Sequence, residues 1–304
     1  MRLYEYQAKK LLQAEGIPIP LNQIIEDPKQ IQIPFPVVLK AQIPAGGRKK
    51  AGGIVSSSNA QEAATQIENL RKLNLRGFQV NCILAEQKLP IAQEFFLAVT
   101  YDTAVKQPVA LMSAEGGIDI EELAREKPHK VIQRYFNITK GLAEHTAREM
   151  VLQTGLKGND LTRVADLLYR MAVLFLNIDA TIVEINPLVK TTDGKFFAAD
   201  CHIDIDDDAL FRQKKYLEEI HNIPVKESAG KEATPFERRA AEIDAQDYRG
   251  VAGRMIEFDG DMGLLIGGGG ASLTSFDAIK KHGGRPANYC EIGGNPSVIK
   301  VKEL

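Results

Sequence analysis

Residues 37–53, VVLKAQIPAGGRKKAGG, join a short apolar run to a loop rich in glycine and cations. The apolar run predicts a buried β-strand, and Lys40 ends it, where a charge is costly without an anionic partner. The loop contains four glycines, which permit close backbone approach, and three cations, Arg48, Lys49 and Lys50. Inward-pointing N–H groups and cations would suit a polyphosphate, but a surface hairpin with a solvated basic tip is an equal alternative.

The composition describes an ordinary water-soluble chain. Its 304 residues suit two domains, and 44% hydrophobic with 26% charged residues are typical of a globular protein. The net charge of -2 predicts no general attraction to nucleic acid or to an anionic membrane. Three widely spaced cysteines indicate neither a disulfide framework nor a zinc site. Because we see neither a secretory signal nor a membrane-spanning run, we expect a cytoplasmic protein.

Helical and strand patterns alternate along the first two thirds of the chain, which predicts an α/β fold. Apolar residues at helical spacing predict helices at 3–14, 59–73 and 144–177, the last interrupted by glycines. Apolar, β-favouring runs predict strands at 82–86, 94–101, 108–113, 181–186 and 195–200. We expect Pro187 to stop the strand before it, since proline cannot donate a backbone hydrogen bond.

The character of the sequence changes after residue 210. Residues 210–247 are highly charged and predict a surface helix and a linker. Residues 262–270, MGLLIGGGG, then predict a strand that runs into a glycine-rich turn, with a helix beginning at Ser272. We therefore expect a domain at 1–230, a linker at 231–255 and a doubly wound domain at 256–304. Because that last domain is short for its type, we expect the chain to be truncated.

Two acidic regions predict sites for a metal ion and for a nucleotide. Glu184 and Asn186 alternate on one face of a strand, and Asp200 ends the strand predicted to return beside it. Such oxygen ligands, completed by phosphate and water, suit Mg²⁺, although a plain hairpin edge is the alternative. Glu86 ends the strand CILAE, where it could accept hydrogen bonds from a ribose or an adenine amino group or could simply be solvated.

At this point several motifs together resemble one family. MRLYEYQAKKLLQAEGIPIP, VVLKAQIPAGGRKKAGG, AEGGIDIEELAREKPH, VEINPLV and DDDALFR follow the order seen in the nucleotide-binding β subunit of succinyl-CoA synthetase. The resemblance covers most of the chain. It implies an ATP-grasp domain followed by the beginning of a flavodoxin-like CoA-ligase domain. ATP citrate lyase, citryl-CoA synthetase and malate–CoA ligase share this plan.

The resemblance also implies a set of site residues. The purine nucleotide, ATP/ADP or GTP/GDP, would be held by Lys40, Gly47, Arg48, Lys49, Glu86, Leu89 and Glu94. The Mg²⁺ ligands would be Asn186 and Asp200. Leu89 and Glu94 are indicated by the resemblance alone. The acid substrate would face the second-domain turn, at Gly267, Gly268, Gly269, Gly270 and Ser272, where N–H groups at a helix N-terminus attract anions.

Several features depart from the family pattern, among them Cys201 and His202 after Asp200, where the family usually has a small residue and then lysine. Lys49 stands where the family loop usually has glycine, which adds a cation and restricts the backbone. The turn reads GGGGAS, which is more similar to ATP citrate lyase than to the succinate enzyme. The family's later phosphate-facing loop has no match before Leu304. These departures leave citrate or malate open as the acid, and they leave open a nucleotide-binding module without catalysis.

The family's reaction implies a partner. An acid, CoA and ATP become acyl-CoA, ADP and phosphate through a phosphohistidine on an α subunit, which also holds CoA. None of the five histidines of this chain lies in that family motif, so we expect the phosphohistidine on the partner, in a heterodimer or heterotetramer with an α subunit, and the catalytic residues of this chain are unknown. A carboxylate–amine ligase of the wider ATP-grasp class is a weaker alternative.

Overall fold

The protein is described by a computed structural model, which covers residues 1–25, 31–118, 120–225, 234–250 and 255–304. These residues form two compact units, Met1–Lys231 and Glu232–Leu304, which are considered separately. Within the described residues, no helix combines the length and the apolar character that crossing a bilayer requires.

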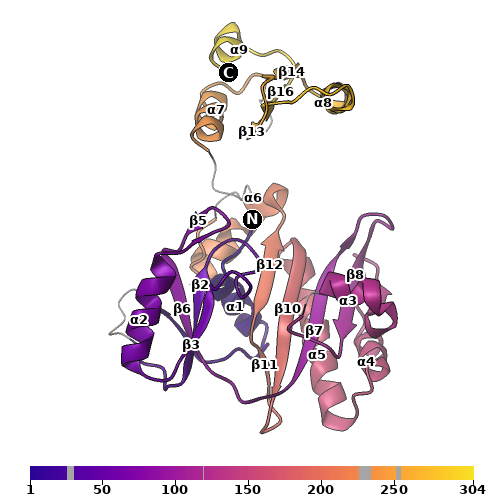
Figure 1. Cartoon of the computed structure of the whole chain (residues 1–304). Helices are drawn as coiled ribbons and strands as arrows, with labels where there is room; N and C mark the ends of the chain where they lie inside the picture. Colours follow the sequence, from indigo (N-terminus) through magenta and orange to yellow (C-terminus); the bar gives the residue numbers. More distant parts are fainter. Residues whose placement is uncertain (26–30, 119, 226–233, 251–254) are drawn as a thin grey trace. The chain divides into compact units, whose positions relative to one another are not determined.

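The larger unit contains two antiparallel sheets (Figure 1). The first has the strand order β1-β6-β2-β3, formed by Asn22–Ile25, Cys82–Gln87, Val37–Gln42 and Ile54–Ser57. Helix α2, Ala60–Arg71, packs against it and begins after Asn59, whose side chain accepts a hydrogen bond from the Glu62 N–H. The predicted strand at the start of residues 37–53 is therefore confirmed as β2. A small hairpin, β4 Asn74–Leu75 and β5 Phe78–Gln79, follows α2.

The second sheet has the order β11-β10-β7-β8-β9, and β12 also pairs with β10. Its strands are β7 Ile91–Asp102, β8 Gln107–Ser113, β9 Ile132–Tyr135, β10 Ala180–Thr191, β11 Phe196–Ala198 and β12 Cys201–Ile205. Helices α4, Glu144–Gln153, and α5, Gly158–Asn177, confirm the predicted interrupted block. Shorter helical segments are α3 Ile120–Glu126, η2 Pro128–Lys130, η3 Asp207–Ala209, α6 Leu210–Lys214 and η4 Lys215–Ile220.

The expectation that Pro187 stops its strand is wrong. Strand β10 continues through Pro187 to Thr191. The pairing of β10 with β7 shifts register between Ile185 and Leu188, so the ladder is irregular where proline has no N–H to donate. The Pro187 carbonyl still accepts a hydrogen bond from Ala199. The predicted returning strand, residues 195–200, is also shorter than expected, because β11 ends at Ala198 and Asp200 lies between β11 and β12.

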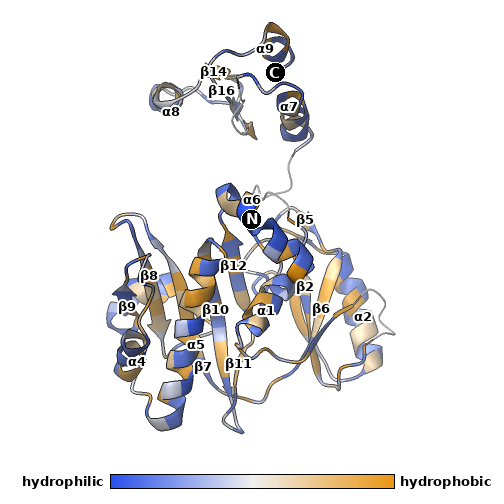
Figure 2. Ribbon diagram, turned by 180° about the vertical axis from the view of Figure 1, so that it is seen from behind, coloured by the Kyte–Doolittle hydropathy of each residue, from blue (hydrophilic) through white to orange (hydrophobic). Residues whose placement is uncertain are grey.

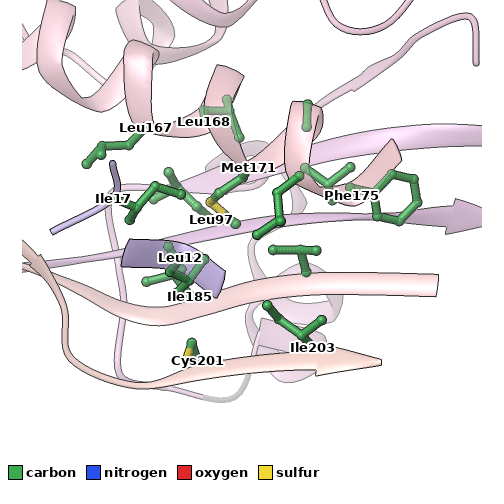
Figure 3. Close-up of a cluster of buried hydrophobic side chains, with 14 of the residues drawn as sticks. Leu12, Ile17, Leu97, Leu167, Leu168, Met171, Phe175, Ile185, Cys201 and Ile203 are labelled. Atoms are coloured by element: carbon green, nitrogen blue, oxygen red, sulfur yellow. The ribbon is translucent and has the colours of Figure 1, made fainter. Parts of the chain in front are cut away.

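A buried apolar core holds helix α1, Glu5–Ala14, against the second sheet. Figure 3 shows Leu12 and Ile17 beside Leu97, Ile185 and Cys201 of that sheet, with α5 residues Leu167, Leu168, Met171 and Phe175 closing the core. In Figure 2 strand β6 is coloured mainly hydrophobic, whereas β10 carries both hydrophobic and hydrophilic segments. Burial of these side chains fixes α1, which carries two of the charged residues described below.

The smaller unit contains a parallel strand pair. Strands β14 Ile266–Gly267 and β16 Glu291–Ile292 are parallel and are connected through helix α8, Gly270–Lys281. Such a crossover is the unit of a doubly wound domain. The other elements are α7 Pro235–Ala245, β13 Ile256–Glu257, β15 Asn288–Tyr289 and α9 Val298–Glu303.

The predicted linker, residues 231–255, overlaps this smaller unit. Helix α7 lies in that range and contacts α9 and β13. Residues 231–233 and 251–254 of the predicted linker lie outside the described residues. The domain bounds of the sequence analysis therefore stay a prediction.

Candidate functional site

Six charged side chains of the larger unit form one charged cluster, which comprises Glu5, Lys9, Lys40, Arg48, Glu86 and Asp200. Three of them are cations and three are carboxylates. All except Asp200 are more than nine-tenths buried. Because a buried charge is costly unless it is paired, the fold must keep these groups together.

Sheet pairing places Lys40 beside Glu86. In the antiparallel pair β2 and β6, Val38 lies opposite Glu86 and Lys40 lies opposite Leu84. Lys40 and Glu86 are therefore diagonal neighbours on one face of the sheet. The Lys40 ammonium lies 2.7 Å from Glu86 Oε1. Glu86 is thus one anionic partner of the lysine that ends the apolar run.

Helix α1 contributes the next pair, Glu5 and Lys9, which lie one turn apart. Glu5 Oε1 accepts a hydrogen bond from Lys40 Nζ at 2.8 Å and lies 2.9 Å from Lys9 Nζ. Lys9 also donates to Glu86 Oε2 and, at 2.9 Å, to the carbonyl of Ala199. The same carbonyl accepts from Lys40 at 2.5 Å. Helix α1 therefore connects β2 and β6 with the segment that precedes β12.

Arg48 connects the glycine-rich loop to the second sheet. Its Nη2 donates to Asp200 Oδ1 at 2.7 Å and its Nη1 donates to the carbonyl of Ala41 at 3.2 Å. The same Nη1 lies 2.7 Å from Glu5 Oε2, as an ion pair without the alignment of a hydrogen bond. Arg48 and Asp200 are 152 residues apart in the chain, so this contact is entirely a product of folding.

The cluster keeps Glu5, Lys40 and Arg48 charged. Burial alone would raise the pKa of Glu5, but Lys40, Lys9 and Arg48 outweigh it and hold that pKa well below its ordinary value. Burial alone would lower the pKa of Lys40, but Glu5, Glu86 and Asp200 outweigh it and raise that pKa. The pKa of Arg48 is likewise raised against burial by Glu5 and Asp200. Glu5, Lys40 and Arg48 are therefore ionised at neutral pH.

The glycine-rich loop forms more hydrogen bonds within its own backbone than the sequence suggests. The N–H groups of Ala51, Gly52 and Gly53 donate to carbonyls of the loop itself. Our expectation that the loop's N–H groups point inward to a ligand is therefore wrong for these three. Gly47 has φ of 76°, which favours glycine, and is exposed, as is Lys49. Lys49 has no left-handed backbone, so the lysine in place of the family's glycine causes no such strain.

The other two predicted nucleotide residues, Leu89 and Glu94, follow β6 in the chain. Leu89 is half-buried between β6 and β7, and Glu94 is half-buried on β7, opposite Val189 of β10. A Cβ added to Gly117 would lie 2.5 Å from Glu94 Oε2, so this carboxylate packs directly on the Gly117 backbone. The Gly117 N–H in turn donates to Asn186 Oδ1 at 2.8 Å. Glu94 and Asn186 therefore flank the same glycine.

The predicted metal ligands Asn186 and Asp200 are neighbours. The Asn186 N–H donates to the Asp200 carbonyl at 3.0 Å. Glu184 is held beside them: desolvation raises its pKa, and His202 and a hydrogen bond with Asn186 act in the opposite direction. In the described part of the chain, no three His, Cys, Asp or Glu side chains form a metal-binding group. An amide and a carboxylate oxygen fit Mg²⁺, which takes its other ligands from phosphate and water.

The turn in the smaller unit is built around Ser272. Its hydroxyl is buried, donates to the Gly269 carbonyl at 2.7 Å and lies 2.8 Å from both Tyr289 Oη and Glu291 Oε2. Helix α8 begins at Gly270, so our expectation that it begins at Ser272 is wrong by two residues. A Cβ added at Gly267, Gly269 or Gly270 would meet no atom within 4 Å, which leaves open space before the turn.

Two members of the charged cluster, Glu5 and Lys9, were missed by sequence reasoning. Their spacing of four residues on a helix is typical of a solvated ion pair, so the pattern alone carries no signal for a buried site. The available signal was indirect. Lys40 needed an anionic partner, and the charges of α1 share that helix with its apolar face.

The larger unit, with its two sheets joined by this cluster, contains an ATP-grasp domain, since the family model for the ATP-grasp domain matches residues 2–190. The β subunit of the ADP-forming succinate–CoA ligase of Methanocaldococcus jannaschii is 37% identical over 99% of this chain and 77% of its own length. The β subunit of the GDP-forming ligase of Thermus thermophilus is 37% identical over 97% of this chain and 75% of its own length.

The chain belongs to the family of succinate–CoA ligase β subunits, a family of ligases. It spans about three quarters of the length of these relatives. Among solved structures, ATP citrate lyase from Methanothrix soehngenii, in complex with citrate and coenzyme A, is similar in fold, with a TM-score of 0.68. That likeness covers 99% of this chain and 74% of the other at 20% identity.

Lys49→Gly tests whether the unusual lysine hinders or helps. Because its backbone is not left-handed, glycine relieves no strain, removes a cation and makes the loop more flexible. We expect nucleotide affinity to fall by about threefold to tenfold, a cost near 1 kcal/mol. Isothermal titration with Mg·ADP measures it. Tighter binding by the glycine variant would contradict this expectation. Lys72→Gly, just after α2, is a control on which affinity should not depend.

Proposed function

We propose that the charged cluster and the adjoining loop bind the phosphates of a Mg²⁺-bound purine nucleotide. The observation that carries the proposal is the Arg48–Asp200 contact, which joins the glycine-rich loop to the candidate metal ligands. Lys40, Arg48 and Lys49 supply positive charge, and Gly47 supplies close backbone approach. Glu86, Leu89 and Glu94 would line the rest of the nucleotide site. Asn186 and Asp200 would hold the ion.

The chemistry that this arrangement supports is phosphoryl transfer. Such transfer is catalysed mainly by positioning and charge neutralisation, and a bound Mg²⁺ would supply charge that bridges the phosphates. Lys40 and Arg48 are kept protonated by their carboxylates, so they present fixed positive charge to an incoming phosphate. The nucleotide is ATP/ADP or GTP/GDP, since the relatives named above include both an ADP-forming and a GDP-forming ligase.

The relatives are β subunits, which supports a partner-dependent reaction, and the location that we propose for it is the cytoplasm. We propose that this chain couples ATP, ADP and phosphate to the formation or cleavage of an acyl-CoA, together with an α subunit that carries CoA and the phosphohistidine. The acid would face Gly267, Gly268, Gly269 and Gly270, with open space beside Gly267, Gly269 and Gly270, whereas Gly268 packs against the Ile292 backbone. Ser272 would support that turn from behind, because its hydroxyl is engaged within the protein. Succinate is the first candidate acid, and citrate and malate are the alternatives.

Isothermal titration of the chain with ADP and with GDP, each with Mg²⁺, tests the nucleotide site first. We expect saturable binding of one nucleotide per chain. Addition of the α partner, CoA and ATP to succinate, citrate or malate then tests the reaction, with the acyl-CoA measured as product. Failure of both nucleotides to bind would overturn the proposal. Binding without acyl-CoA formation from any of the acids would support a nucleotide-binding module.

A further inference from the structure

Lys9 and Lys40 share the same hydrogen-bond acceptors. Both ammonium groups contact Glu5 Oε1, one oxygen of Glu86 each, and the carbonyl of Ala199. Lys9 reaches them from helix α1, and Lys40 reaches them from strand β2. Lys9 is fully buried and has no part in the proposed nucleotide contacts. The protein therefore places two buried lysines on one set of acceptors, and only Lys40 belongs to the proposed nucleotide site.

Lys40 has no spare hydrogen for a phosphate in this arrangement. A lysine ammonium has three donors, and those of Lys40 face Glu5, Glu86 and Ala199 at 2.8, 2.7 and 2.5 Å. A nucleotide phosphate can bind Lys40 only if the lysine gives up at least one of these acceptors. A buried carboxylate that loses its only cation is strongly destabilised.

Lys9 removes that obstacle because it contacts the same acceptors. When Lys40 turns to a phosphate, Glu86 keeps Lys9 as its partner, and Glu5 keeps Lys9 and Arg48. The cluster holds three cations and three carboxylates. Lys40 can therefore bind a phosphate while each carboxylate keeps at least one other cation as its partner.

We propose that Lys9 is a positioning residue, which holds the buried carboxylates of Glu5 and Glu86 and so releases the Lys40 ammonium for a nucleotide phosphate. This inference rests on the proposed function, in which Lys40 contacts the nucleotide. It predicts that Lys9 affects nucleotide affinity although it does not touch the nucleotide, and that its effect depends on the charge of Glu86.

The experiment is a double-mutant cycle on the full chain, measured as the Kd for Mg·ADP by isothermal titration. The variants are Lys9→Met, Glu86→Gln and their combination, with Lys40→Met as the direct test of the phosphate contact. Lys10→Met is the matched control, because Lys10 is exposed on the same helix and lies over the Tyr6 ring. Thermal unfolding sets a temperature at which every variant is folded, so that changes in Kd are separate from changes in stability.

We expect Lys9→Met to raise the Kd about tenfold or more when Glu86 is present, and less than about threefold when residue 86 is glutamine. Lys10→Met should leave the Kd unchanged. Equal effects of Lys9→Met in both backgrounds, or a lowered melting temperature with an unchanged Kd, would overturn the inference while leaving the nucleotide site intact. A Lys40→Met variant that binds like the wild type would instead overturn the proposed function and the inference with it.

Discussion

Glu5→Gln is expected to lower the free energy of unfolding of the larger unit by about 3–5 kcal/mol, the usual cost of breaking a buried ion pair. Glu5 faces three cations, Lys9, Lys40 and Arg48, at 2.7–2.9 Å, and it is 4% exposed. Glutamine keeps the shape of the side chain but removes its charge. Three buried cations would then share two carboxylates, of which only Glu86 is buried.

Urea unfolding followed by circular dichroism measures this loss. Glu68→Gln is the matched control, because Glu68 is an exposed glutamate on helix α2 and its substitution should change stability by less than about 0.5 kcal/mol. The double variant Glu5→Gln with Lys9→Met restores equal numbers of cations and carboxylates, so it should lose less than the sum of the single losses. A loss below about 1 kcal/mol for Glu5→Gln would contradict this expectation. It would show that water or rearranged side chains compensate for the missing carboxylate charge.

The loss of stability caused by Glu5→Gln should also depend on pH, and the pKa of Glu5 determines the direction of that dependence. The folded-state pKa of Glu5 lies well below its ordinary value because Lys40, Lys9 and Arg48 outweigh its desolvation. A carboxylate with a depressed folded pKa stabilises the fold fully above its unfolded pKa, about 4.3, and loses that contribution as the pH falls toward the folded value. The difference in stability between wild type and Glu5→Gln should therefore be constant from pH 6 to 8 and should shrink below about pH 4.

Local patterns predicted much of the fold. The run before Lys40 became strand β2, Asn59 caps helix α2, and glycines divide the block that became α4 and α5. These features depend on residues close together in the sequence, where periodicity and capping act directly. The prediction that Pro187 ends its strand was wrong because a register shift accommodates the proline. That shift depends on the pairing of β10 with β7, which a local sequence pattern does not contain.

The candidate site was likewise predictable from the sequence only in part. Lys40 was identified as a charge that needs an anionic partner, but its partners Glu5 and Glu86 lie 35 and 46 residues away. Arg48 was interpreted as a loop cation, whereas the fold buries it against Asp200. Such contacts arise when α1 packs on β12 and brings its charges to β2 and β6. The residue types were therefore visible in the sequence, and their shared cluster required the tertiary structure.

Asp200→Asn is expected to weaken Mg²⁺-dependent nucleotide binding at least about 100-fold, because even residues that only support a metal ligand are worth roughly 10–100-fold in metal affinity. The two contacts of the Asp200 side chain with Arg48 and the Cys201 N–H both use Oδ1. The side chain is 31% exposed, so an ion can reach it. Asparagine keeps an oxygen ligand but removes the negative charge that Mg²⁺ favours.

Titration of ADP with excess Mg²⁺ and with EDTA separates the role of the ion from that of Arg48. Wild type should bind far more tightly with Mg²⁺ than with EDTA, whereas Asp200→Asn should bind weakly and equally in both. Asp193→Asn is the matched control, because Asp193 lies in the turn between β10 and β11 and pairs with Lys195. If Asp200→Asn lowers affinity by the same factor with and without Mg²⁺, Asp200 acts by orienting Arg48 and the ion is bound elsewhere. If Mg²⁺ dependence is lost while binding in EDTA is unchanged, Asp200 is the residue through which this fold couples the metal to the nucleotide.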